Sequence, residues 1–198
     1  MPAKESYFQK LEMQAFRAGV APRTKESLEW FKKRLKSVSR VNRKELLKDD
    51  LLKRVSTPLA GRMYMYFYDP KTKATLPYYD RFPLIILIDK VEGGFTGLNL
   101  HYLPPILRAK FFDRLLDFTN NKNYDNSTRF KLTYQFLANA SKLKEFKPCF
   151  KRYLTSHVQS KITEIPATEW EVALFMPTDV FVYNTRQTVW KKTRKLLA

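Results

Sequence analysis

Three short segments of this 198-residue chain concentrate positively charged side chains. Such groups neutralise the phosphates of a nucleic acid and release condensed counterions, which provides affinity without readout of the base sequence. The alternative interpretation is a set of solvated helix faces, because charge runs are common on helices. A shortage of compensating acids favours phosphate binding. The candidate nucleic-acid-binding residues are Lys32, Lys33, Arg34, Lys36, Arg40, Arg43, Lys44, Lys191, Lys192, Arg194 and Lys195.

Aromatic residues lie among or near these cations, at Trp30, Phe31, Tyr153 and Trp190. Their rings would suit stacking on the bases of single strands or frayed ends. Each of them equally suits a hydrophobic core, so both interpretations stay open.

Acidic residues around the predicted strands offer a different chemistry. Asp69, Asp80, Asp89 and Glu92 are candidates for a metal-binding nuclease cluster, with Lys90 nearby. Such a site needs carboxylates that converge on one cation. All four stand at predicted turns, where aspartate is common for backbone reasons, so a structural role is the preferred interpretation.

The remaining inventory contains little that predicts catalysis. His101 and His157 are the only histidines, and their spacing is not that of a metal site. Cys149 is the only cysteine, which excludes an intramolecular disulfide and a zinc site built from several cysteines. The glycine-rich residues 93–97 lack the lysine and hydroxyl of a phosphate-binding loop and predict a hairpin turn. We expect a non-enzymatic protein without cofactor or bound metal.

The net charge of +18 is distributed unevenly along the chain. The net charge is +8 in residues 1–55, +2 in residues 56–126 and +8 in residues 127–198. A compact domain with this charge repels itself, so the composition favours an anionic partner, with nucleic acid first. A hydrophobic content of 44% is nevertheless enough to build a core.

The residues before 58 are predicted to be helical. Apolar residues recur at helical spacing in residues 6–16, and Thr24 can cap a second helix. Asn42 and Glu45 approach a capping box for a third helix that runs toward Pro58. The pattern is compatible with an arm that packs on the rest of the chain and with one that projects outward.

The middle of the chain predicts a small antiparallel sheet of three to five strands. Residues 63–68 alternate methionine or phenylalanine with tyrosine, which suits a strand that is apolar on both faces. Residues 82–88 and 97–103 complete the proposed sheet. Residues 161–165 and 180–183 are further candidates for extended structure.

Two long helices are expected to cover this sheet. Proline is tolerated in a first helical turn, so Pro104 and Pro105 predict a helix that ends at Asn120. Ser127 or Thr128 can cap the next helix.

Shorter helices are predicted in the last third of the chain. One follows Pro148 and runs through Leu154, and another is expected where Thr168 and Glu171 form a capping box. A last helix or tail begins at Thr185 and contains no acid.

Several stretches between residues 60 and 175 resemble a known phage family. They are residues 66–71 (YFYDPK), 76–84 (LPYYDRFPL), 97–105 (GLNLHYLPP), 155–161 (TSHVQSK) and 169–175 (EWEVALF). They are similar to small virion proteins of T-even-like contractile-tailed bacteriophages, notably the DNA end protector family. The resemblance implies a protein that coats the end of the packaged genome, blocks host exonuclease and sits near the head-to-tail channel.

These observations predict an α+β fold, a small antiparallel sheet packed with helices. We expect a basic helical arm (residues 1–57), an α+β core domain (58–184) and a basic C-terminal helix or tail (185–198). The predicted function is non-specific DNA binding in a bacteriophage virion, with protection of the genome end. The alternative is a structural neck, tail or baseplate component that binds other virion proteins. The expected partners are the DNA backbone and virion proteins, without a membrane, because the apolar runs are too short to cross one. We expect the protein in the virion, and in the host cytoplasm during assembly.

Overall fold

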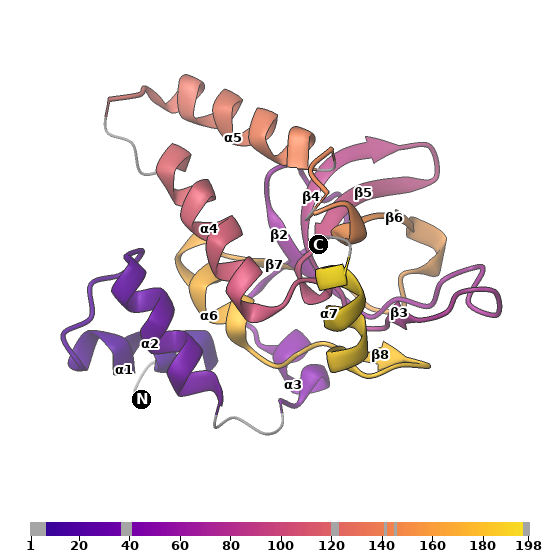
Figure 1. Cartoon of the computed structure of the whole chain (residues 1–198), viewed down its shortest axis with the longest axis horizontal. Helices are drawn as coiled ribbons and strands as arrows, with labels where there is room; N and C mark the ends of the chain where they lie inside the picture. Colours follow the sequence, from indigo (N-terminus) through magenta and orange to yellow (C-terminus); the bar gives the residue numbers. More distant parts are fainter. Residues whose placement is uncertain (1–6, 37–40, 120–122, 141, 145, 196–198) are drawn as a thin grey trace.

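A six-stranded antiparallel sheet forms the centre of the protein in a computed structural model, which confirms the predicted α+β class (Figure 1). The structure describes residues 7–36, 41–119, 123–140, 142–144 and 146–195. The strand order is β1-β7-β2-β4-β5-β6, and β3 pairs with β8 in a separate two-stranded sheet. The strands are β1 (Lys53–Val55), β2 (Met63–Met65), β3 (Tyr79–Asp80), β4 (Leu84–Val91), β5 (Gly94–Asn99), β6 (Phe150–Leu154), β7 (Ile162–Ile165) and β8 (Phe181–Val182).

Helices cover one face of this sheet. Figure 1 shows α4 and α6 between the sheet and the pair formed by α1 and α2. The helices are α1 (Tyr7–Arg17), α2 (Lys25–Lys36), α3 (Arg43–Lys48), α4 (Pro105–Thr119), α5 (Asn126–Ala140), α6 (Trp170–Phe175) and α7 (Arg186–Lys195). A 3₁₀ turn, η1 (Leu100–Tyr102), connects β5 to α4. No helix in the described ranges is both long and apolar enough to cross a membrane.

One continuous hydrophobic core joins the sheet to helices from both ends of the chain. Phe8 of α1 and Phe31 of α2 belong to the same buried cluster as Met63 of β2, Phe111 of α4 and Val189 of α7. The first two helices therefore pack on the rest of the protein, a point that the sequence left open. The division into arm, core domain and tail stays a prediction.

The second face of the sheet holds an aromatic cluster. Because side chains alternate along a strand, Met63 and Met65 face the helices while Tyr64 and Tyr66 face the opposite side, as the period-two pattern predicts. Tyr66 packs edge-to-face against Phe95 at 5.8 Å between ring centroids. The aromatic cluster comprises Tyr64, Tyr66, Tyr68, Ile85, Leu87, Phe95, Tyr153 and Ile162.

The sheet curves around the aromatic cluster because a short segment of the chain joins β6, at one edge, to β7, near the other edge. β6 pairs with β5 at one edge, whereas β7 pairs with β2, and only residues 155–161 join β6 to β7. Tyr68 forms an antiparallel bridge with Val158, and the Leu154 amide donates to the Tyr68 hydroxyl at 3.1 Å. These contacts bring the end of β6 to the end of the strand that begins with β2.

Several predicted turns and caps are confirmed. The amide of Ser27 donates to Thr24 Oγ1 at 3.1 Å, and the amide of Glu45 donates to Asn42 Oδ1 at 3.3 Å. The glycine-rich segment forms the β4–β5 hairpin, with Gly93 at φ +70°. The capping box at Thr168 is wrong, because α6 has no side-chain cap and Glu171 accepts instead from Ser27 Oγ at 2.8 Å.

Two predicted helices contain strands instead. The helix predicted from Pro148 through Leu154 is wrong, because residues 150–154 form β6, which pairs with the otherwise open edge of β5. The helix predicted from Asn42 toward Pro58 ends at Lys48, and residues 53–55 form β1 beside β7. With these two strands and β7, the sheet has six strands, more than the predicted three to five. The predicted extended segment at residues 161–165 is confirmed as β7.

A buried polar network connects three separated parts of the chain. Asp80 of β3 accepts a hydrogen bond from Nδ1 of His101 at 2.7 Å and from Nδ2 of Asn99 at 3.0 Å. His101 Nε2 lies 3.0 Å from the hydroxyl of Thr178. Burial opposes ionisation of Asp80, but His101, Asn99 and the Phe82 amide outweigh it and hold the pKa of Asp80 below its ordinary value.

The backbone carbonyl oxygen of His101 connects this network to two helices, α4 and α7. Trp190 Nε1 of α7 donates to this oxygen at 2.8 Å, and Arg108 Nη2 of α4 donates to it at 3.2 Å. Arg108 also donates to the carbonyl of Leu174 in α6 at 2.9 Å. Burial lowers the pKa of Arg108 to about 10, so the guanidinium stays charged at neutral pH. The position of α7 therefore depends on η1.

Substitution of Asp80 by alanine tests this network. It leaves two buried side-chain donors and the amides of Phe82 and Val180 without their acceptor. We expect the free energy of unfolding at pH 7 to fall by about 3–5 kcal/mol, measured by urea denaturation. Because the pKa of Asp80 is lowered in the folded state, its stabilising effect is present above the ordinary aspartate pKa and is lost as the pH falls through the folded value.

Asp89→Ala is the matched control, because Asp89 is exposed on β4 and contacts the backbone amide of the next residue. Its effect should stay below about 0.5 kcal/mol. Equal effects of the two substitutions would contradict the structural role of Asp80.

Candidate nucleic-acid interface

The predicted cations of α2 lie at the N-terminal side of the molecule. Lys33 and Arg34 are exposed, and Arg34 Nε donates to Gln14 of α1 at 3.2 Å. Lys32 pairs with Glu29 at 2.7 Å, which compensates its charge within the helix. Lys36 ends α2, and its side chain lies outside the described part of the structure.

The predicted cations at residues 40–44 have different surroundings in the structure. Arg40 lies outside the described residues. Arg43 is half-buried at the start of α3, where Nε donates to the carbonyl of Thr178 at 2.7 Å and Nη2 to that of Asp179 at 3.0 Å. Burial lowers its pKa, although Asp179 opposes the shift. Arg43 thus holds the loop before β8, whereas Lys44 is exposed to solvent.

The four predicted cations of α7 are exposed and form the α7 basic surface, defined by Lys191, Lys192, Arg194 and Lys195. The opposite side of the helix is fixed in the core. Val189 is fully buried, and the hydroxyl of Thr193 donates to the carbonyl of Tyr102 at 2.9 Å. Residues four positions apart share a helix face, so Lys191 and Lys195 project together, away from this anchored side. α7 itself contains no acidic residue.

A fifth cation, Lys151, lies beside this surface and was not among the residues predicted from the sequence. Lys151 of β6 places Nζ 4.4 Å from the centroid of the Tyr102 ring, and Lys192 places Nζ 4.8 Å from that of Tyr78. The two rings are 6.0 Å apart, so the cations from β6 and α7 are held on neighbouring tyrosines. Because a helix was predicted at residues 150–154, the alternation that places Lys151 on the inner side of a strand was not recognised.

The aromatic residues predicted near the cations mostly belong to the core. Phe31 is buried in the main cluster, Tyr153 in the aromatic cluster, and Trp30 is half-buried against the main cluster. Trp190 is half-buried and bonded to His101. Leu35 of α2 is buried in the main cluster together with Phe31.

The four acids considered for a nuclease site do not come together. Asp69 pairs with Lys73 at 2.7 Å, and Asp80 is buried in its network with His101. Asp89 and Glu92 are exposed on the β4–β5 hairpin. Among the described residues, no group of three or more histidine, cysteine or acidic side chains is arranged to hold a metal ion.

The other candidate groups have structural surroundings. His157 Nδ1 lies 2.8 Å from the carbonyl of Asp69, and His101 is buried in the Asp80 network. Cys149 is buried, and burial raises the pKa of its thiol to about 12. A thiol that stays protonated at neutral pH is a poor nucleophile.

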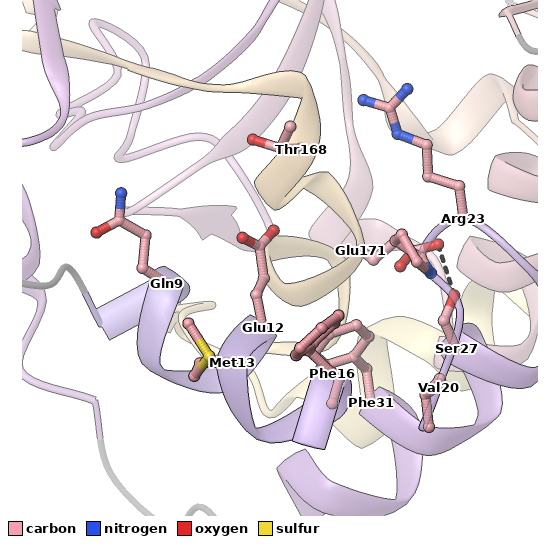
Figure 2. A pocket seen from close by; sticks show the side chains of 12 residues that line it. Gln9, Glu12, Met13, Phe16, Val20, Arg23, Ser27, Phe31, Thr168 and Glu171 are labelled. Atoms are coloured by element: carbon pink, nitrogen blue, oxygen red, sulfur yellow. Dashed lines mark hydrogen bonds between the residues drawn. The ribbon is translucent and has the colours of Figure 1, made fainter. Parts of the chain in front are cut away.

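A cavity of about 730 Å³ between α1, α2 and α6 is lined by two carboxyl groups and one guanidinium, that of Arg23 (Figure 2). Met13, Phe16 and Phe31 form its apolar side, while Glu12 and Glu171 carry its carboxyl groups. Burial and the neighbouring Glu171 raise the pKa of Glu12 to about 7, although Arg23 opposes the shift. Two carboxyl groups in an apolar setting disfavour an anionic ligand.

Comparison with known proteins places the chain in a class of bacteriophage proteins that protect the ends of DNA. A family model described as Phage T4 terminal DNA protecting protein matches residues 4–195. The chain belongs to this family, which confirms the resemblance found in the sequence. Among curated proteins and among solved structures, no significant match was found.

Glu12→Gln tests the charge of the cavity beneath α1. Because the folded-state pKa of Glu12 is raised, its contribution to stability is full below about pH 4.5 and is lost as the pH rises to about 7. The glutamine variant avoids this loss. We expect its free energy of unfolding to exceed that of the original protein by about 1–2 kcal/mol at pH 8, after allowance for partial exposure. At pH 4 the two proteins should be equally stable.

The measurement is urea denaturation at both pH values, with Glu92→Gln as the exposed control. Glu92 lies in the β4–β5 turn and should show no such dependence. A gain for Glu12→Gln that is equal at pH 4 and pH 8 would show that charge burial is not its cause.

Proposed function

We propose that this protein protects the ends of phage DNA by binding phosphates with the α7 basic surface, assisted by the exposed cations of α2 and α3. The observation that carries the proposal is the construction of α7. Four cations project from a helix without acidic residues, while Val189, Trp190 and Thr193 fix its other side. A rigid array of uncompensated cations is what backbone binding requires.

The proposed contacts use the residues that the fold leaves exposed. Lys33, Arg34 and Lys44 extend the phosphate-binding set beyond α7. Arg43 supports this set indirectly, because its guanidinium holds the loop at Thr178 and Asp179. Arg40 and Lys36 remain part of the proposed set.

Protection follows from occupancy and needs no chemical step by the protein. An exonuclease must reach the terminal nucleotides, and a protein bound to the last phosphates blocks that access. Backbone contacts carry no sequence information, so the same protein can protect any terminus. We therefore propose a non-enzymatic protein that works without a cofactor and stays with the packaged genome in the virion.

A charge-removing variant of α7 tests this mechanism. In Lys191→Gln/Lys192→Gln/Arg194→Gln/Lys195→Gln, we expect affinity for linear duplex to fall at least ~100-fold at 0.1 M salt. The slope of log K against log salt concentration should flatten by about 3–4, because about 0.9 counterion is released per contact. Digestion of the linear duplex by a double-strand exonuclease should then proceed as if no protein were added.

The control removes four exposed cations outside the proposed interface, in Lys53→Gln/Lys142→Gln/Lys144→Gln/Lys161→Gln. It has the same net charge as the α7 variant and should retain most of the protection. Thermal unfolding verifies that both variants fold. Full protection by the folded α7 variant, or binding that is insensitive to salt, would sink the proposal.

A further inference from the structure

A second cavity lies beside the α7 basic surface and has a cationic lining. Its volume is about 430 Å³, within the range of pockets that hold small ligands. The segment from Tyr68 to Tyr79, η1 and β6 enclose it. Its cations are Lys71, Lys151 and Arg152, and its rings include Tyr78 and Tyr102. This composition combines positive charge with flat apolar surfaces.

Lys151 is the central cation of this cavity. It is half-buried in β6, and its ammonium group lies on the ring of Tyr102. No carboxylate in the described residues forms an ion pair with it. Burial lowers the pKa of Lys151, because solvent stabilises its charge less than usual. An anion in the cavity would supply the missing counter-charge.

The one acid in the lining does not neutralise this charge. Both oxygens of Asp80 accept hydrogen bonds within the buried network, from His101, Asn99 and the amides of Phe82 and Val180. Asp80 is 3% exposed. Lys71 and Arg152, by contrast, are exposed at the rim, and Arg152 Nη2 donates to the carbonyl of Glu92 at 2.8 Å. The lining therefore contains three cations and a single carboxylate whose oxygens are already hydrogen-bonded.

The cavity and the α7 basic surface form one continuous region. Tyr78 carries Lys192 of α7 on its ring, and Tyr102 carries Lys151, with 6.0 Å between the two ring centroids. A duplex that lies along α7 and ends at Tyr78 would have its last nucleotide next to the cavity.

We propose that this cavity binds the terminal phosphate monoester of a DNA strand, with Lys151 as its principal ligand and the half-buried Tyr78 against the attached nucleoside. The inference rests on the proposed function, since it assigns the end-specific part of the same interface. An internal phosphodiester carries one negative charge and continues the chain on both sides. A terminal monoester carries close to two charges near neutral pH and projects freely, so it can reach into the cavity more readily than a phosphodiester that is held in the chain on both sides.

The experiment compares three DNA substrates of equal length and sequence. They are a linear duplex with 5′-phosphates, the same duplex with 5′-hydroxyl ends, and a closed circle. We expect the original protein to bind the phosphorylated ends about 10-fold more tightly than the hydroxyl ends. Lys151→Met keeps the buried stem but removes the charge, and it should abolish this preference while changing affinity for the circle less than about 2-fold.

Lys151→Arg and Lys161→Met are the matched variants. Lys151→Arg keeps the charge and should retain most of the preference, and Lys161→Met removes an exposed cation outside the cavity and should behave like the original protein. A folded Lys151→Met variant with the original preference would overturn the assignment. So would equal binding of phosphorylated and hydroxyl ends by the original protein, and this result would leave general DNA binding by α7 intact.

Competition on the original protein tests the same site without a substitution. A 5′-mononucleotide at millimolar concentration should erase the preference for phosphorylated ends, whereas the corresponding nucleoside should not. If the preference for phosphorylated ends persists in the presence of the mononucleotide as well as the nucleoside, the cavity is not the phosphate site. If the mononucleotide binds as tightly as the phosphorylated duplex, the ligand of the cavity is a free nucleotide and the assignment to a DNA end is wrong. Failure to bind any of the three DNA substrates would instead reject the proposed function itself.

Discussion

The interaction between Asp80 and His101 sets the geometry on which the proposed interface depends. It connects β3 to η1 through their side chains, and Thr178 brings the loop before β8 to the other nitrogen of the same imidazole. The backbone carbonyl of His101 then receives Trp190 from α7. A carboxylate buried at this depth is stable only when its acceptor sites are filled, and four donors fill them here. The cationic helix is thus positioned by a group that it does not touch.

This arrangement separates the cations into supporting and exposed groups. Arg108 is inside the protein and bonded to three carbonyl oxygens, and Arg43 holds the loop at residues 177–179. A charged group that is bonded within the protein is unavailable to a ligand. The net charge of the chain is therefore larger than the charge that a ligand can contact. The lysines of α7 and Lys151 differ, because rings or solvent surround them instead of acceptors. The supporting cations and the exposed cations thus differ in where the fold places their side chains.

Local patterns predicted the elements whose signals are contained within one segment. The alternation at residues 63–68, the turn at Gly93 and the caps at Thr24 and Asn42 each depend on neighbours in the sequence. β1 and β6 were missed because their identity depends on partners far along the chain, β7 and β5. The cavity with Lys151 was missed for the same reason, since β6 and the segment around Tyr78 are separated by about 70 residues. The exposed positions of α7 were predicted, but the buried role of Arg43 required the loop that it holds.

The order of the strands also determines when the sheet can be completed during synthesis. β2, β4 and β5 leave the ribosome early, yet β6 and β7, which cover their two open edges, follow more than fifty residues after β5. Until residues 150–165 emerge, the nascent chain displays unpaired edges beside a strongly apolar strand, the state in which strands of different molecules associate. The aromatic cluster closes in the same interval, since Tyr153 and Ile162 arrive with these strands. The interval between the synthesis of β5 and that of β7 is therefore the period in which the growing chain is most exposed to aggregation.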